Sequence, residues 1–314
     1  MLKERPLPPT EPPLSPVAVL GAGLIGTGWI ALCLAAGLEV RAFDPDPATL
    51  ASLRDRLRPL RRDLGRLKKP RRGKLVAASS LEAAVRGARL IQENAPEKLE
   101  TKRALFARIE AAAAPDAIIA SSTTALLWSE LQAGMQRPER LLIAHPFNPV
   151  HLIPLVELFT PEDALAERAA AFYTGLGKHP VRLEREMPGH IAGRLAAALW
   201  REAVHLVAEG VASVEAVDAA LTHGPGLRWA VQGAHLAYHT GGGPGGMAHY
   251  LAHLGASQEQ RWRTLGNPSL DAETRELLIR GIADATGNAP VGDLERRRDA
   301  ALVELLRARR RVTT

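Results

Sequence analysis

The sequence predicts an α/β fold in which a mostly parallel sheet is covered by helices, followed by a domain built of helices alone. Three observations predict it. Short apolar runs typical of buried strands alternate with helical patterns through the first part of the chain, which indicates a parallel sheet with helices on both faces. After Pro188 all segments have helical periodicity. The length of 314 residues is enough for two domains. We therefore expect a sheet domain at 16–187 and a helical domain at 188–314.

The elements follow in order along the chain. Residues 1–15 are rich in proline and contain no apolar stretch, so we expect a disordered or loosely docked tail rather than a secretory signal. Strands are expected at 17–20, 38–43, 88–92, 116–120, 140–144, 155–159 and 181–183. Helices are expected from the glycine turn to about residue 36, at 48–74 and 97–113, and then at 189–211, 213–223, 227–238, 245–254, 271–285 and 291–309.

Composition and charge exclude several classes of protein. Lysines and arginines outnumber acidic residues by only 40 to 34, an excess too small to indicate a nucleic-acid partner. The single cysteine, Cys33, excludes an internal disulfide framework and fits a reducing compartment. Residues 17–38 carry no charge over 22 residues, a length that could cross a bilayer, but they contain five glycines. We interpret them as a buried strand, turn and helix, and expect a cytoplasmic protein without a membrane partner.

The glycine-rich segment predicts a dinucleotide site. Gly21-Ala22-Gly23-Leu24-Ile25-Gly26 has the GxGxxG pattern, follows an expected strand and opens an expected helix, which is the context of a Rossmann-type phosphate site. Asp44, at the end of the second strand, can accept hydrogen bonds from a ribose and would repel a 2′-phosphate, which favours NAD over NADP. A simple loop turn or a FAD site are the alternatives. The expected cofactor-binding residues here are Gly21, Gly23, Leu24, Ile25, Gly26 and Asp44.

A second motif predicts proton transfer. His145-Pro146-Phe147-Asn148-Pro149 follows an expected strand, and Glu157 comes twelve residues after the histidine. Oxidation of an alcohol needs a base for the hydroxyl proton, and imidazole, with an ordinary pKa of about 6.5, suits that role. A carboxylate on the next strand can orient the imidazole and stabilise its charged form. Without further context, a structural histidine is an equally good interpretation.

This segment resembles the L-3-hydroxyacyl-CoA dehydrogenase superfamily, whose catalytic loop reads HxFNP with a glutamate at the same distance. The run 121–126 (Ser-Ser-Thr-Thr-Ala-Leu) also follows the family pattern. The resemblance implies that His145 is the general base, that Glu157 orients it and that Asn148 lies near the reacting carbon. It further implies a catalytic role for Thr124, where the family usually has serine, and places Asn94, Glu97 and Lys102 near the nicotinamide end of NAD.

Within the superfamily, the chain looks most like the branch of carnitine 3-dehydrogenases, with the gulonate 3-dehydrogenase (lambda-crystallin) branch next. The segments at 97–99, 137–141, 199–203, 226–230 and 241–247 carry this likeness, which covers roughly 15–310. It implies NAD-dependent oxidation of the 3-hydroxyl of a small 3-hydroxy acid to a 3-keto acid, with L-carnitine as first candidate. L-Gulonate and a 3-hydroxyacyl-CoA are alternatives, as is a non-catalytic NAD-binding structural or sensor protein. The family also implies a homodimer formed through the helical domain.

Several residues bear on the substrate. Gly193 stands where hydroxyacyl-CoA enzymes usually carry asparagine and carnitine enzymes usually carry aspartate, so a substrate contact is missing. A quaternary ammonium is commonly held by aromatic faces. We therefore predict that Phe147, Trp128, Trp200 and Trp229 contact the substrate, although helix-borne tryptophans can equally fill a core.

Two further patterns have open interpretations. Residues 54–74 contain eleven basic and two acidic residues, either a solvated helical face or a patch that attracts the phosphates of NAD or CoA. His235 and His239, and likewise His249 and His253, share a helical face, but no third ligand accompanies either pair. We therefore predict no metal site.

Overall fold

The computed structural model describes residues 14–313, so most of the predicted tail at 1–15 lies outside the described residues. The chain divides into two compact units. The first unit comprises the residues up to Gly193 together with Asp299–Ala308, and the second comprises Arg194–Arg298 and the residues from Arg309 onward. Our predicted division between residues 187 and 188 stays a prediction.

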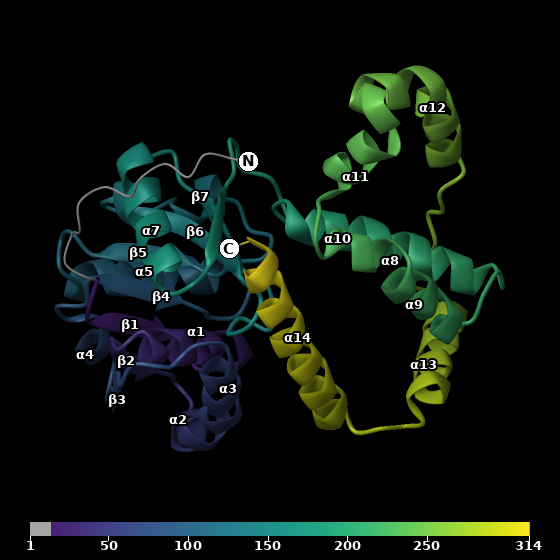
Figure 1. The fold of residues 1–314 in the computed structure, drawn as a ribbon. Helices are drawn as coiled ribbons and strands as arrows, with labels where there is room; N and C mark the ends of the chain where they lie inside the picture. Colours follow the sequence, from purple (N-terminus) through teal and green to yellow (C-terminus); the bar gives the residue numbers. More distant parts are fainter. Residues whose placement is uncertain (1–13, 314) are drawn as a thin grey trace. The chain divides into compact units, whose positions relative to one another are not determined.

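The first unit contains an eight-stranded sheet, and its mostly parallel arrangement confirms the predicted fold class (Figure 1). The strand order is β3-β2-β1-β4-β5-β6-β7-β8, and all neighbours are parallel except β6 and β7. The strands are β1 Val17–Leu20, β2 Glu39–Phe43, β3 Lys74–Ala77, β4 Leu90–Glu93, β5 Ile118–Ser121, β6 Leu141–Pro146, β7 Leu155–Phe159 and β8 His179–Arg182.

Helices cover both faces of this sheet. They are α1 Leu24–Ala35, α2 Pro47–Ala51, α3 Leu53–Leu67, α4 Leu81–Val85, α5 Leu99–Ala112, α6 Trp128–Leu131 and α7 Asp163–Gly175, with a 3₁₀ turn, η1, at Pro138–Arg140. One core lies between the sheet and helices α1, α3 and α7, and the other between the sheet and α4, α5 and α6. Alternate residues of β1 enter opposite cores: Val17 and Val19 the first, Ala18 and Leu20 the second. This explains why β1 is apolar throughout.

The uncharged window 17–38 is therefore accounted for by β1, the glycine turn and α1. Nine of the twelve residues of α1 are buried, among them Trp29 and Cys33. No helix within residues 14–313 combines the length and apolar character needed to cross a membrane. The window is apolar because both its strand, β1, and its helix, α1, are buried in the first unit.

Several elements of the first unit differ from the prediction, among them the short helices α4 and α6, which were not expected. The expected helical stretch at 48–74 ends at Leu67, and Lys74–Ala77 form the edge strand β3. This strand is only partly buried and follows the basic run, so its apolar signal is weak. Helix α7, Asp163–Gly175, was not predicted either, because alanines supply much of its buried face and give little amphipathic contrast.

The second unit consists of helices. They are α8 Ala192–Ala208, α9 Val214–His223, α10 Pro225–Trp229, α11 Ala234–Gly241, α12 Gly246–Arg263, α13 Ala272–Thr286 and α14 Val291–Thr313, with a 3₁₀ turn, η2, at Gly243–Gly245. The all-helical prediction is thus confirmed, although α12 runs nine residues beyond the predicted 245–254. The first two residues of α8, Ala192 and Gly193, belong to the first unit, and so does the part of α14 at Asp299–Ala308.

The middle of α14 belongs to the first unit. Val303 is fully buried there, and Glu304 forms an ion pair with Arg66 of α3, with 2.8 Å between Oε1 and Nη2. Arg307 donates a hydrogen bond from Nε to the carbonyl of Arg66 at 2.9 Å. The chain therefore returns to the sheet unit after the helices of the second unit.

Candidate active site

The turn between β1 and α1 is shaped by its glycines. Gly21 has a φ of +82°, which L side chains rarely adopt, and a Cβ there would lie 2.7 Å from the carbonyl oxygen of Asn94. A Cβ on Gly26 would lie 1.8 Å from the carbonyl oxygen of Gly21, so only glycine lets α1 start this close to the strand. A Cβ on Gly23 would meet no atom within 4 Å, so the space in front of the helix is open.

Backbone amides at the start of α1 border this open space. No side chain caps the N-terminus of α1, so the amides of its first turn, Leu24, Ile25 and Gly26, lack a side-chain partner from the cap residue. Helix N-termini of this kind attract phosphate through their amides and the helix dipole. The turn therefore fits the pyrophosphate of NAD.

Asp44 lies beside the same turn, immediately after β2. Its Oδ2 accepts a hydrogen bond from the amide of Ala22 at 2.7 Å, and its Oδ1 accepts one from the amide of Asp46 at 3.0 Å. The half-buried carboxylate is thus held next to the phosphate-binding turn, where a dinucleotide places its adenosine ribose. This geometry fits NAD and is unfavourable for a 2′-phosphate.

Asn94 and Lys102 are held by other protein groups. The side-chain amide of Asn94 donates to the carbonyl of Leu20 at 3.1 Å, and its Oδ1 accepts from Ser122 Oγ at 2.8 Å. Lys102 is 1% exposed and its ammonium lies 2.7 Å from Oε1 of Glu93, which is fully buried. Asn94 therefore braces the glycine turn, and Lys102 supports neighbouring carboxylates from within the core.

Glu97 organises the loop that carries Thr124. Its Oε1 accepts hydrogen bonds from Thr123 Oγ1 at 2.5 Å, from the amide of Thr124 at 2.8 Å and from the amide of Ala125 at 3.0 Å. Burial raises the pKa of this carboxyl, but these hydrogen bonds and the charge of Lys102 outweigh it and hold the pKa below its ordinary value. An ionised Glu97 therefore fixes the loop, which leaves Thr124 exposed.

His145 and Glu157 form a buried pair. They lie directly opposite one another on the antiparallel strands β6 and β7, with 2.9 Å between Nδ1 of the histidine and Oε2 of the glutamate. Because a carboxylate accepts, Nδ1 carries the hydrogen and Nε2 remains as the base. The histidine is 6% exposed and the glutamate 1%. The predicted pair is thus brought together by one hairpin.

The second oxygen of Glu157 is also bound. Its Oε1 accepts from the amides of Ile191 and Ala192, at 2.8 and 2.9 Å. Burial raises the pKa of the Glu157 carboxyl, but the hydrogen bond from His145 and those two amides outweigh it and leave the pKa below its ordinary value. A carboxylate kept ionised beside an imidazole stabilises the imidazolium form.

The substrate residues predicted from sequence are spread over the two units. Asn148 is exposed and Phe147 half-buried in the loop that follows His145. The indole nitrogen of Trp128 donates to the carbonyl of Leu141 at 2.9 Å, and its ring packs on the second core, which favours the core-filling alternative. Trp200 and Trp229 belong to the second unit, where they are 56% and 40% exposed. No atom lies within 4 Å of a Cβ built on Gly193.

The basic run 54–74 is mostly solvent-facing. Nine of its eleven basic residues are exposed, which favours the solvated-face interpretation for them. Arg56 is different: one of its terminal nitrogens donates to the carbonyl of Ala22 at 2.7 Å and to Thr27 Oγ1 at 2.8 Å. This arginine therefore braces the glycine turn and the first turn of α1.

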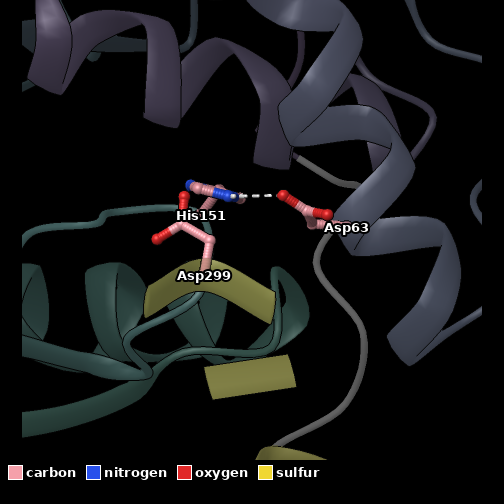
Figure 2. Close-up of side chains that lie close together, drawn as sticks. All are labelled: Asp63, His151 and Asp299. Atoms are coloured by element: carbon pink, nitrogen blue, oxygen red, sulfur yellow. Dashed lines mark ion pairs between the residues drawn. The ribbon is translucent and has the colours of Figure 1, made fainter. Parts of the chain in front are cut away.

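Asp63, His151 and Asp299 form a separate polar cluster (Figure 2). They come from α3, from the loop after Asn148 and from α14, and their side chains point toward one another, with 3.8 Å between His151 Nε2 and Asp63 Oδ2. Among the described residues, three possible metal ligands come together only in this cluster. The pairs His235/His239 and His249/His253 therefore have no third ligand in the described part of the chain. The cluster connects the loop that carries Asn148 to two helices of the first unit.

Sequence reasoning missed two residues of the site. Glu93 pairs with Lys102, and His190 packs its ring against that of His145. An acidic residue ending an apolar strand was the available signal for Glu93. For His190, a histidine after Pro188-Gly189 carries no periodic pattern, so only the folded chain reveals its position.

Comparison with known proteins places the chain in a family. The family model described as "3-hydroxyacyl-CoA dehydrogenase, NAD binding domain" matches residues 16–187, and the model of the C-terminal domain of the same family matches residues 189–270. The chain is 44% identical over 298 residues to an L-carnitine dehydrogenase of Streptomyces coelicolor, covering 93% of this chain and 94% of that protein. An L-carnitine dehydrogenase of Pseudomonas aeruginosa is 44% identical over 297 residues, which are 93% of this chain and 92% of that protein.

A solved structure agrees with this. The crystal structure of 5-formyl-3-hydroxy-2-methylpyridine 4-carboxylic acid 5-dehydrogenase, described as an NAD⁺-dependent dismutase, is similar with a TM-score of 0.78. It is 26% identical and the match covers 94% of this chain and 98% of that one. The comparisons support the expected enzyme over a non-catalytic binding protein. The chain belongs to the 3-hydroxyacyl-CoA dehydrogenase family and is an NAD-dependent oxidoreductase that acts on 3-hydroxy acids.

Proposed function

We propose that the chain oxidises L-carnitine at its 3-hydroxyl to 3-dehydrocarnitine, with NAD as the cofactor. The observation that supports this reaction is the buried His145–Glu157 pair. Nδ1 of His145 lies 2.9 Å from Oε2 of Glu157, which leaves Nε2 free to act as the base. The choice of L-carnitine is supported by the relatives named L-carnitine dehydrogenase at 44% identity. L-Gulonate and a 3-hydroxyacyl-CoA are the alternatives.

In the proposed mechanism, Nε2 of His145 removes the proton of the C3 hydroxyl. Glu157 holds the imidazole through Nδ1 and stabilises the charge that it gains. Thr124 and Asn148, both exposed on their loops, would contact the oxygen at C3 as it becomes a carbonyl. NAD, when bound, supplies the acceptor for the hydrogen that leaves C3 with its electron pair.

The residues proposed to hold NAD come from the carboxyl ends of the parallel strands. The first-turn amides of α1, which open on the space at Gly23, would bind the pyrophosphate. Asp44 would bind the adenosine ribose. Asn94 and Glu97 follow β4, the next strand, where the nicotinamide end is expected. Lys102 would act from the core by supporting Glu93 and Glu97.

A substrate panel tests this proposal. Reduction of NAD is followed by absorbance with L-carnitine, D-carnitine, L-gulonate and 3-hydroxybutyryl-CoA. We expect L-carnitine to have the highest kcat/KM. A higher kcat/KM for the acyl-CoA would overturn the carnitine proposal. A preference for L-gulonate would favour the gulonate 3-dehydrogenase branch instead.

We also propose that the chain forms a homodimer through its second unit. In this unit α9 and α10 contain no buried residue, and α8 contains one, Val204. Large apolar side chains are exposed instead, among them Val231 at 73%, Trp262 at 64% and Ile279 at 62%. Exposed apolar area of this extent is typical of a surface that a partner covers, and a second copy would supply the missing core.

A further inference from the structure

A second imidazole packs against the proposed base. The ring centroids of His190 and His145 are 4.9 Å apart, and the ring planes are inclined by 44°. His190 is 2% exposed, and its Nε2 lies 3.1 Å from the carbonyl oxygen of Thr123. A carbonyl only accepts, so Nε2 of His190 carries the hydrogen and donates it. The ring of His190 is therefore held at Nε2 by the carbonyl of Thr123 and also packs against the ring of His145.

The backbone that presents His190 is strained. Its φ is +51°, a left-handed conformation that is unfavourable for a residue with a Cβ and occurs at only one other non-glycine residue among those described. The two following amides, Ile191 and Ala192, are those that bind Oε1 of Glu157. One turn thus directs an imidazole at His145 and two amides at its carboxylate partner. Strain retained at such a point is a reason to look for a function.

The hydrogen bond of His190 reaches the loop that carries Thr124. On its other side this loop is bound by Glu97, which accepts from Thr123 Oγ1 and from the amide of Thr124. The loop 121–126 is therefore fixed at two points, one of which is a side chain in contact with the proposed base. Any shift of His190 would change the spacing between His145 and Thr124.

We propose that His190 is a positioning residue that ties the ring of His145 to the loop 121–126 and so sets the spacing between the base and the Thr124 hydroxyl. The inference rests on the proposed function, because the two groups would contact the same substrate oxygen. His190 does not itself exchange a proton with substrate. Burial lowers the pKa of His190 and outweighs the opposing effect of its hydrogen bond to Thr123, which favours the neutral imidazole.

Two variants separate the tether from simple filling of space. His190→Phe keeps a ring of similar size but loses the donor to Thr123, whereas His190→Gln keeps a donor near the position of Nε2 but loses the ring. We expect the phenylalanine variant to lose about 10- to 100-fold in kcat, with the KM for NAD close to wild type, because small misplacements of reacting groups cost this much. We expect the glutamine variant to retain more of kcat than the phenylalanine variant. His179→Gln, at an exposed histidine of β8, is the control and should match wild type.

A wild-type kcat in His190→Phe, or a phenylalanine variant more active than the glutamine variant, would overturn the proposal. The second readout does not depend on activity and holds even if the phenylalanine variant does not fold. NMR of the ¹⁵N-labelled histidines, assigned by difference with His190→Gln, should show neutral His190 as the Nε2–H tautomer. A neutral His190 that carries its hydrogen on Nδ1 would contradict the tether, because Nε2 could then not donate to the carbonyl of Thr123. Inactivity of the wild type on every 3-hydroxy acid would instead refute the proposed function and leave the NMR result to decide the contact.

Discussion

At the scale of single residues, the site depends on how each polar group is satisfied. The two oxygens of Glu157 are divided between His145 and the amides of Ile191 and Ala192. His145, which lies opposite Glu157 on the sheet, uses Nδ1 for this pair and is left with Nε2 free, although its side chain is almost fully buried. A buried carboxylate with all its partners in place is costly to disturb, since loss of any one leaves an unsatisfied group.

Replacing the base tests its role directly. We expect His145→Ala to lower kcat/KM by about 10²- to 10⁴-fold, the contribution typical of general acid–base catalysis. The dissociation constant for NADH, measured by fluorescence titration, should stay close to wild type because the glycine turn is built from other strands. Retained turnover would remove His145 from the mechanism, and loss of NADH binding would show that the variant is damaged more widely.

The ionisation of Glu157 predicts a pH dependence of stability. Folding lowers the pKa of this carboxyl, against the effect of burial, so it stabilises the folded state above its ordinary pKa of 4.5 and loses that contribution as the pH falls through the lowered value. The difference in unfolding free energy between wild type and Glu157→Gln, measured by urea denaturation, should therefore shrink as the pH falls below about 4.5. Glu184→Gln, at an exposed carboxylate, is the control. A difference that does not change with pH would show that Glu157 is not ionised in the folded chain.

Gly193 offers a test of substrate recognition. A Cβ there meets no atom within 4 Å, so Gly193→Asp and Gly193→Asn should both fold with a Tm at or above that of wild type, since glycine is unfavourable in a helix. Aspartate is the residue that the resemblance to carnitine 3-dehydrogenases implies at this position, and its charge would attract the trimethylammonium group of the proposed substrate. We expect the aspartate variant alone to lower the KM for L-carnitine. An equal rise in KM for both variants would mean that the substrate occupies the open space.

At the scale of elements, β1, the glycine turn and α1 act as one unit. The helix can start beside the strand only because Gly26 lets its backbone approach the carbonyl of Gly21. Asn94, which follows β4, and Arg56 of α3 brace the same turn. Gly26 thus allows the helix to lie close to the strand, whereas Gly23 leaves the space in which a phosphate would bind.

Two alanine substitutions separate these properties. Gly26→Ala places a Cβ 1.8 Å from the carbonyl oxygen of Gly21, so we expect the free energy of unfolding to fall by at least about 1–3 kcal/mol. Gly23→Ala meets no protein atom, so stability should be close to wild type while NAD binding weakens, because the methyl group occupies the space for the pyrophosphate. Denaturation and NADH titration of both variants measure the two effects. Equal loss of stability in both would refute the distinction.

At the scale of the whole molecule, the two units differ in how they bury apolar surface. The first unit has two cores, one on each face of its sheet. The second unit leaves many of its large apolar side chains exposed, including Trp262 and Ile279. A helical unit with so little core of its own needs another surface to cover it.

The proposed dimer has a direct test. We expect wild type to have the mass of a dimer in light scattering after size-exclusion chromatography. Trp262→Glu with Ile279→Glu should raise the dimer dissociation constant at least about tenfold, because charges would replace large apolar contacts. The control is Arg263→Glu, which changes charge on the same helix without removing an apolar side chain. A monomeric wild type, or a double variant that associates as wild type does, would refute the proposal.

The sequence by itself determined the fold class, the glycine turn and the position of Asp44, and its family resemblance pointed to the His145–Glu157 pair. Each of these depends on local pattern: period, glycine spacing, or two strands joined in one hairpin. Residues whose position depends on distant partners could not be predicted. The edge strand β3 is defined by pairing with β2 and not by its own composition.

Only the tertiary structure decided which polar groups meet. It brought His190 to His145 and Glu93 to Lys102. It also packed the indole of Trp128 against a core, with its nitrogen donating a hydrogen bond to the carbonyl of Leu141. The physical reason is that a hydrogen bond or ring contact requires a few ångströms in three dimensions. Sequence spacing defines that distance only within one helix, one turn or one pair of adjacent strands.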